Sequence, residues 1–150
     1  MDDVGDSRDS LARAVAEAMM GREGTAAAWG LRLEDVAPGR ARVSMLVRPN
    51  MLNGHGTAHG GMIFALADSA FAYACNAANE TTVGQHASIA FLSPARAGER
   101  LVAAADVVAE AGRSGVYTVT VSAGDGRAVA QFQGLSRTVG GPVLKETIDD

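Results

Sequence analysis

A single acidic residue lies in the middle of the most apolar long stretch of this sequence. Residues 62–78 contain no Pro or Gly and consist mostly of good helix formers. Their polar residues, Asp68, Ser69 and Asn76, form no continuous stripe, which predicts a long helix that is apolar on nearly all sides and buried. An interior Asp cannot cap such a helix and is costly to remove from water. Asp68 is therefore the first candidate for acid–base or nucleophilic chemistry; the alternative is an Asp that faces a solvent gap or bonds a neighbouring strand.

The glycine-rich loop before this helix is the second candidate, and it reads Asn53-Gly-His-Gly-Thr-Ala-His59-Gly60-Gly61. The first N–H groups of a helix have no partner inside it and carry the positive end of the helix dipole. Because Gly60 and Gly61 have no side chains to block approach, an oxygen that develops negative charge could bind there. Glycines before a helix are also common in simple tight turns, so the loop alone is a weak indication.

His55 and His59 are four residues apart, a spacing that on a helix would place two imidazoles on one face as metal ligands. They precede the predicted helix, however, and the Glu of a His-Glu-x-x-His motif is absent. We therefore expect neither a metal nor a cofactor. The only cysteine, Cys75, excludes an internal disulfide, and its apolar setting favours packing over nucleophilic catalysis.

The composition limits the partners of the chain. Its 150 residues suit one domain with a substantial core. With 13 basic and 17 acidic residues the formal net charge is -4, so we expect no general attraction to nucleic acid or to an anionic membrane. The acidic N-terminus lacks the apolar core of a signal peptide, and no run approaches the ~20 apolar residues of a membrane span. We therefore expect a cytoplasmic protein.

The remaining pattern predicts the elements that position these candidates. Residues 1–27 are interpreted as an acidic segment, frayed up to residue 9, followed by a short peripheral helix that Asp9 or Ser10 caps. Apolar alternation and turn signals then predict six strands, at residues 28–37, 40–48, 81–92, 99–109, 116–123 and 127–137. This order indicates an α+β fold, an antiparallel sheet around one long helix over residues 28–138, with a loose tail at 139–150.

The long helix also predicts self-association. A single sheet covers only one side of a helix that is apolar all round, so the rest should meet another copy of the chain. Gly60 and Asp68 are eight residues apart, or roughly 12 Å along a helix. Groups that serve one carbonyl must both lie about 3 Å from the reacting atoms, so one chain cannot build the site. Two helices side by side about a two-fold axis would place Asp68 of one beside Gly60 of the other. We expect at least a homodimer and favour a homotetramer.

The loop motif, its spacing to Asp68 and the later run Phe91-Leu92-Ser93-Pro94-Ala95 resemble the hotdog-fold acyl-CoA thioesterases of the phenylacetate-degradation (PaaI) type. The resemblance covers about residues 28–138. It implies the hotdog fold, an acyl-CoA substrate of phenylacetyl-CoA or hydroxyphenylacetyl-CoA type, and the same paired arrangement of two chains.

The resemblance also implies roles for individual residues. Asp68 would be the catalytic carboxylate, the Gly60 N–H would bind the thioester oxygen, Asn53 would position substrate or water, and His59 would line the same site. Members of the family often carry a Ser or Thr on the strand after the helix. In this sequence Ser88 is the candidate for that position.

Further substrate contacts are expected from the helix start and from basic residues. Gly61 would let the substrate approach beside Gly60. CoA carries phosphates, and Arg113 is the preferred partner because glycines flank its Gly-Arg-Ser-Gly turn. The other basic candidates are Arg96, Arg100 and Arg137.

The expected reaction is hydrolysis of a thioester, in which Asp68 either activates a water or attacks the carbonyl directly. Burial would raise the pKa of Asp68, while the positive helix end and nearby donors would lower it, so we expect an ionised carboxylate near neutral pH. Two other functions remain open. A hotdog dehydratase would act through a His and an acid at other positions, and a non-catalytic acyl-CoA binding protein would keep the groove and lose the acid.

Overall fold

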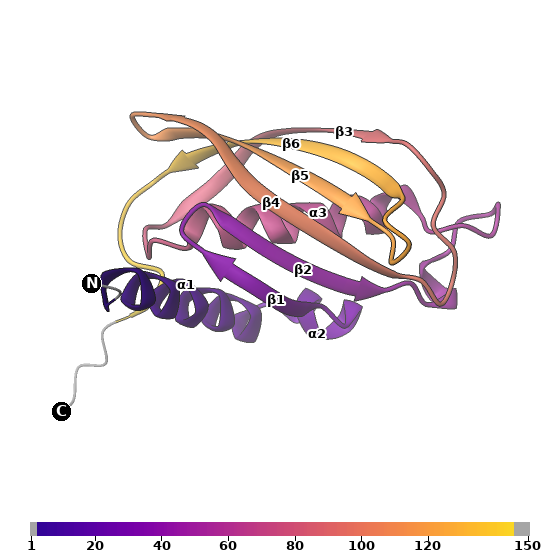
Figure 1. Cartoon of the computed structure of the whole chain (residues 1–150), viewed down its shortest axis with the longest axis horizontal. Coiled ribbons are helices and arrows are strands. Elements are labelled where there is room, and N and C mark those ends of the chain that lie inside the picture. The colour runs from indigo at the N-terminus through magenta and orange to yellow at the C-terminus, as the bar shows by residue number, and fades with distance from the viewer. Residues whose placement is uncertain (1–2, 146–150) are drawn as a thin grey trace.

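Six antiparallel strands form one sheet that curves around a central helix, α3 (Gly60–Asn76), in a computed structural model that describes residues 3–145 (Figure 1). The strands are β1 (Arg32–Ala37), β2 (Arg40–Leu46), β3 (Thr82–Phe91), β4 (Arg100–Ala111), β5 (Ser114–Ser122) and β6 (Ala128–Thr138). Their order is β1-β2-β4-β5-β6-β3, so β1 and β3 are the sheet edges. The predicted α+β hotdog architecture is confirmed, and all six predicted strands are present.

The inner side of α3 packs tightly against the sheet. A Cβ atom added at Gly134 would lie 2.8 Å from the ring of Phe71, and one added at Gly84 would lie 3.0 Å from it. These two glycines therefore make room for the aromatic ring on the paired strands β3 and β6. Phe71 also meets Tyr117 edge-to-face, with ring centroids 5.4 Å apart. The position of the helix on the sheet is fixed by these contacts.

The opposite side of α3 is not covered by the sheet. Asp68 and Gly61 are exposed, and Phe64, Ala65 and other residues of this side are only partly buried. The expectation of a helix buried on nearly all sides is therefore not met within a single chain. The sheet covers one side only, as a single curved sheet must.

The N-terminal segment differs from the expected frayed and peripheral piece. Helix α1 (Asp3–Arg22) is 20 residues long, and its buried residues Ala12, Val15 and Ala16 pack it against β1 and α3. Asp3 and Asp6 in the first turn stabilise the helix, because their negative charges lie at the positive end of the helix dipole. A second helix, α2 (Gly24–Trp29), occupies residues where a strand was expected to begin. None of the helices in residues 3–145 is long and apolar enough to span a membrane.

The segment after β6 was expected to be loose from residue 139, but its described part is held in place. Thr81 accepts N–H bonds from Val139 and Gly140. The Asn79 Oδ1 accepts the N–H groups of Val143 and Leu144 at 3.0 and 2.8 Å. Val143 is buried, so the chain is docked up to Leu144. Residues 146–150 of the predicted tail lie outside the described part.

Candidate active site

Asn53 shapes the loop that precedes α3. Its Oδ1 accepts the N–H groups of His55 at 2.9 Å and Thr57 at 3.2 Å, and its Nδ2 donates to the Thr57 Oγ1 at 3.0 Å. An Asn side chain that bonds its own backbone two residues on stabilises a tight turn. Two further bonds fix the loop, because Ala58 donates to the Ala95 carbonyl and His59 to the Met51 carbonyl, both at 2.8 Å.

His59 caps α3 and determines which helix N–H groups remain available. Its Nδ1 accepts the Gly61 N–H at 2.9 Å. A ring nitrogen that accepts this bond carries no proton, so neutral His59 holds its proton on Nε2. No acceptor among residues 3–145 bonds the Gly60 N–H. Of the two glycines predicted to face the substrate, Gly60 therefore presents the free donor, and Gly61 gives its N–H to His59.

The Gly60 cavity, of about 390 Å³, lies beside this free donor. It is lined by Asn53, Thr57, Ala58, Gly60, Ile63 and residues 91–94. A Cβ atom added at Gly60 would lie 3.0 Å from the Phe91 ring, so the ring closes over the helix start and only glycine fits without a shift. The structure thus brings together Asn53, Gly60 and the Phe91 run that the sequence singled out.

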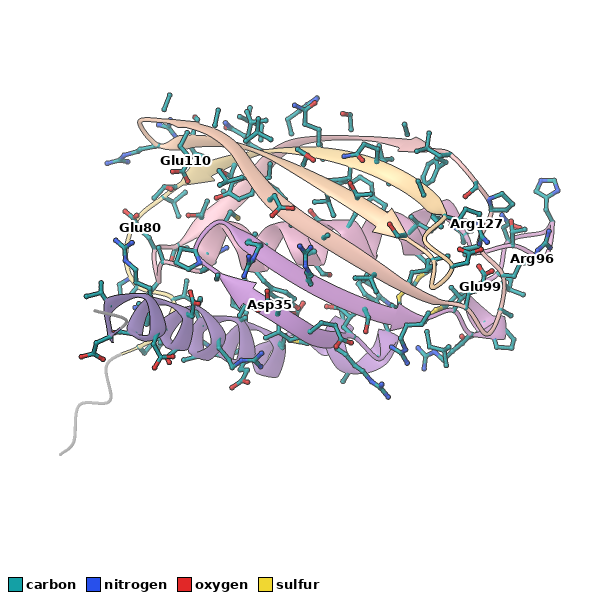
Figure 2. All side chains as sticks on the ribbon, in the orientation of Figure 1. Asp35, Glu80, Arg96, Glu99, Glu110 and Arg127 are labelled. Carbon is teal, nitrogen blue, oxygen red and sulfur yellow. The ribbon has the colours of Figure 1, made fainter. Side chains whose placement is uncertain are left out.

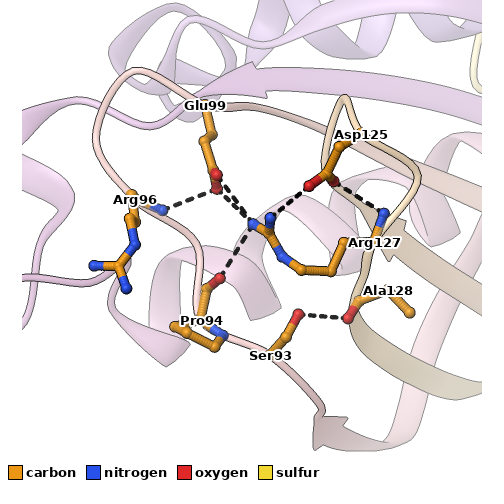
Figure 3. Close-up of polar contacts among 7 residues, drawn as sticks. All are labelled: Ser93, Pro94, Arg96, Glu99, Asp125, Arg127 and Ala128. Atoms are coloured by element: carbon orange, nitrogen blue, oxygen red, sulfur yellow. Dashed lines mark hydrogen bonds and ion pairs between the residues drawn. The ribbon is translucent and has the colours of Figure 1, made fainter.

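One arginine that the sequence did not indicate supports the wall of this cavity. Arg127 donates to both carboxylate oxygens of Glu99 at 2.8 and 3.0 Å, to Asp125 at 2.8 Å and to the Pro94 carbonyl at 3.3 Å (Figure 3). Glu99 also accepts the Arg96 N–H at 3.0 Å. This backbone bond and then Arg127 hold the pKa of Glu99 below its usual value. The arrangement, which we call the Arg127 clamp, fixes the segment from Pro94 to Glu99.

Asp68 lies outside the Gly60 cavity, in a second hollow of the surface. The Asp68 recess, of about 560 Å³, is an open hollow between α1, α2 and α3, and its lining is Met19, Arg22, Glu23, Thr25, Trp29, Phe64, Ala65, Asp68, Ser69, Ala72 and Tyr73. The Asp68 carboxylate has no hydrogen bond or ion pair with any residue of the described part. Although Asp68 keeps much solvent contact, the recess walls displace water, and this burial raises the pKa of its carboxyl. The expected opposing effect of nearby donors is not present within the single chain.

Glu23 ties the N-terminal segment to α3 in this recess. Tyr73 donates its hydroxyl to the Glu23 Oε1, and Thr25 donates to the Glu23 Oε2 at 2.9 Å. Burial, followed by the bond to Glu23, raises the pKa of Tyr73 above its usual value. The segment expected to be peripheral thus builds one wall of the recess. The only Trp of the chain, Trp29, was the sequence signal that could have indicated this.

The remaining candidates are dispersed. His59 lines neither cavity, and Ser88 is exposed on the edge strand β3. Arg113 lines a small polar cavity of about 150 Å³ together with Cys75, Glu80 and Glu110. Figure 2 places Glu80 and Glu110 at the opposite end of the molecule from Arg127.

The two expected catalytic groups are separate within one chain, because the Asp68 recess and the Gly60 cavity share no lining residue. This agrees with the separation of roughly 12 Å that helix geometry predicts. Both His55 and His59 are exposed. Within residues 3–145 no cluster of three or more His, Cys, Asp or Glu residues has the arrangement of a metal site.

Comparisons with known proteins agree with this geometry. Residues 55–130 match the family described as the thioesterase superfamily. The acyl-coenzyme A thioesterase PaaI of Escherichia coli K12 is 40% identical over 131 residues, covering 87% of this chain and 94% of that protein.

Two solved structures extend the agreement to three dimensions. The E. coli PaaI protein from the phenylacetic acid degradation operon has a TM-score of 0.87 at 39% identity, covering 89% of this chain and 97% of that one. A mutant of the phenylacetic acid degradation protein PaaI from Thermus thermophilus has a TM-score of 0.75 at 38% identity, covering 78% of this chain and 100% of that one. The chain therefore belongs to the thioesterase superfamily and is a hotdog-fold thioesterase of the PaaI type.

Proposed function

We propose that the protein hydrolyses an aryl-acetyl CoA thioester, of the phenylacetyl-CoA or hydroxyphenylacetyl-CoA type, to the free acid and CoA. The observation that carries this proposal is an unpartnered carboxylate, Asp68, facing an aromatic recess in a chain whose helix start presents a free N–H at Gly60. A base or nucleophile and an oxyanion donor are the two groups that thioester hydrolysis needs. The relation to PaaI of E. coli supports the same reaction.

The two groups meet, in this proposal, across a homodimer. The open side of α3 carries Asp68, and the neighbouring edge strand β3 has no partner strand on its outer side within the described chain. A second copy related by a two-fold axis would cover both surfaces. Asp68 of each protomer would then lie beside Gly60 of its partner, which gives two equivalent sites. We extend the proposal to a homotetramer, in which two such dimers associate.

The reaction follows from the charges at this composite site. The Gly60 N–H would bind the thioester carbonyl oxygen and stabilise the negative charge that develops on it. Asp68 would either remove a proton from the attacking water or attack the carbonyl carbon itself. In both routes the C–S bond breaks, and the CoA thiolate leaves and takes up a proton. In the first route the attacking water supplies the second oxygen of the acid. In the second route the acyl group forms a mixed anhydride with Asp68, and water then hydrolyses this anhydride, which releases the acid and restores the Asp68 carboxylate. Asn53, which holds the loop, would keep the donor in place, and the His59 imidazole would remain at the rim.

The lining of the Asp68 recess supports an aryl group as the acyl part. Met19, Trp29 and Phe64 offer apolar and aromatic surface next to the carboxylate. Ring substituents with a hydroxyl could reach the polar pair Glu23 and Tyr73. We also propose that the protein acts in the cytoplasm.

The test is a hydrolysis assay that detects the free thiol of CoA. The panel contains phenylacetyl-, 3-hydroxyphenylacetyl-, 4-hydroxyphenylacetyl-, acetyl- and hexanoyl-CoA, and it includes a 3-hydroxyacyl-CoA for dehydration. We expect the aryl-acetyl esters to have the highest kcat/KM. Dehydration without thiol release would establish the dehydratase alternative, and binding of all esters without turnover would establish the non-catalytic one.

A further inference from the structure

A groove of about 380 Å³ between α2 and the strand ends of β1, β2 and β4 brings three arginines together. They come from distant positions, Arg32, Arg48 and Arg100, and the sheet register explains their meeting. Arg32 pairs with Ser44, and Arg100 with Leu46, and paired residues point to the same face. Arg48 follows two residues after the end of β2 and continues its alternation, opposite to the buried core positions. All three therefore lie on the outer face of the sheet.

No carboxylate of the described residues directly neutralises these three guanidinium groups. In the described part of the chain, carboxylates lie within ion-pair distance of Arg13, Arg40 and Arg127, and of none of the three groove arginines. Each guanidinium has five N–H donors.

Few of these donors have acceptors. Arg48 donates to the Ala28 carbonyl, and its buried Nε has no acceptor in the described residues. Arg100 donates to the Ser44 Oγ at 3.2 Å, and Ser44 in turn donates to Glu34 at 2.6 Å. Three positive charges thus remain largely uncompensated in a chain whose net charge is -4. Such a cluster suits a ligand with more than one negative oxygen.

The groove adjoins the proposed reaction site. Trp29 lines both the groove and the Asp68 recess, so the two lie on either side of one residue of α2. In CoA a pantetheine arm separates the thioester sulfur from the phosphates, so a phosphate site belongs beside the recess and not inside it. Arg113, the preferred phosphate partner from the sequence, instead shares its cavity with Glu80 and Glu110, which repel anions.

We propose that the groove formed by Arg32, Arg48 and Arg100 binds the phosphate groups of the CoA part of the substrate, an inference that rests on the proposed thioesterase function. The phosphates lie a pantetheine arm away from the reacting carbonyl. Charge-assisted bonds to them therefore strengthen the binding of the substrate and of the transition state equally. They therefore lower KM and leave kcat unchanged.

The test compares an aryl-acetyl CoA with the matching aryl-acetyl pantetheine, which has the same thioester and no phosphate. Arg32→Gln and Arg100→Gln should each raise KM for the CoA ester about tenfold, as expected for a hydrogen bond to a charged group, with kcat within twofold. Both variants should leave KM for the pantetheine ester within twofold. Arg42→Gln is the matched control, because Arg42 is an arginine of β2 that does not line the groove.

Three outcomes would overturn the inference: an unchanged KM for the CoA ester, an equal rise with both esters, or a rise with Arg113→Gln in place of the groove variants. Failure of the proposed function is a separate result, in which the wild-type protein cleaves neither ester. Titration calorimetry with CoA and with pantetheine then still tests whether the groove binds the phosphates. The groove is supported if wild type binds CoA more tightly than Arg32→Gln does, and refuted if the two bind equally.

Discussion

The Gly60 cavity and the Asp68 recess are built by different means. The Gly60 cavity is formed by loop backbone that Asn53, His59 and the Arg127 clamp hold through hydrogen bonds and ion pairs. The Asp68 recess is formed by three helices that pack through apolar side chains, and its one carboxylate on α3 has no partner in the described chain. Fixed backbone dipoles suit the stabilisation of charge that develops on an oxygen, whereas a partly desolvated acid suits proton removal or attack. In the proposed mechanism, each region supplies one half of the chemistry.

The largest effect should come from removing the carboxylate. We expect Asp68→Asn to lower kcat by about 10²-fold or more, the scale of general acid–base catalysis. Because the described residues hold no partner for Asp68, the variant should keep the fold, which thermal unfolding measures. A folded Asp68→Asn protein with activity within about twofold of wild type would show that the recess is not catalytic.

The second largest effect on kcat should come from blocking the Gly60 N–H donor. Gly60→Val would press against the Phe91 ring and block the free N–H, so we expect a loss of about 10²-fold in kcat, typical of a lost oxyanion donor. Asn53→Ala should lose less, since it loosens the loop and removes no reacting group. A smaller loss at Gly60 than at Asn53 would place the oxyanion donor elsewhere.

Mixing the two inactive proteins tests whether the regions act across an interface. When Asp68→Asn and Gly60→Val chains are refolded together at random, half of the dimers are mixed and one of their two sites is intact. Activity should then return to about a quarter of the wild-type level. Native mass spectrometry checks that mixed dimers form. If they form and stay inactive, the composite site is refuted.

A smaller effect is expected from the clamp that supports the Gly60 cavity. Arg127→Met removes the donors to Glu99, Asp125 and Pro94, which frees the cavity wall, so kcat should fall about tenfold, the scale of one charge-assisted hydrogen bond. Arg127→Lys keeps a charge without the planar fork and should recover part of the loss. Steady-state kinetics at several temperatures measure both. Equal activity of Arg127→Met and wild type would mean that the clamp serves stability alone.

The smallest effect is a pH-dependent change in stability at Asp68. Its pKa in the folded chain is raised, so the folded state binds its proton more strongly than the unfolded state. Ionisation of Asp68 therefore costs stability, a cost that is absent below the unfolded pKa and complete above the folded pKa. Asp68→Asn should raise Tm at neutral pH and show no gain at about pH 3, where the carboxyl is protonated in both states. An equal gain in Tm at both pH values would contradict the raised pKa of Asp68.

The sequence allowed the sheet and α3 to be predicted, because these depend on local patterns, whereas the catalytic roles of Asp68 and Gly60 stay a prediction. Apolar alternation indicates the strands, and the isolated Asp68 in an apolar helix is recognisable as a candidate site residue. Arg127 meets Pro94 and Glu99, which lie 33 and 28 residues away in the sequence, and no local pattern indicates such a meeting. The burial of α1 likewise depends on small residues that find their place only against β1 and α3.

Cys75 has a practical consequence for every assay described above. Burial raises the pKa of its thiol to about 12, and the Sγ donates to the Ala72 carbonyl at 3.5 Å. A protonated, half-buried thiol reacts slowly with disulfide reagents. The folded enzyme thus contributes almost no background to the colour that released CoA produces. A slow rise of one equivalent per chain would instead report opening of the last turn of α3, so the same reagent follows turnover and loss of the folded state in one cuvette.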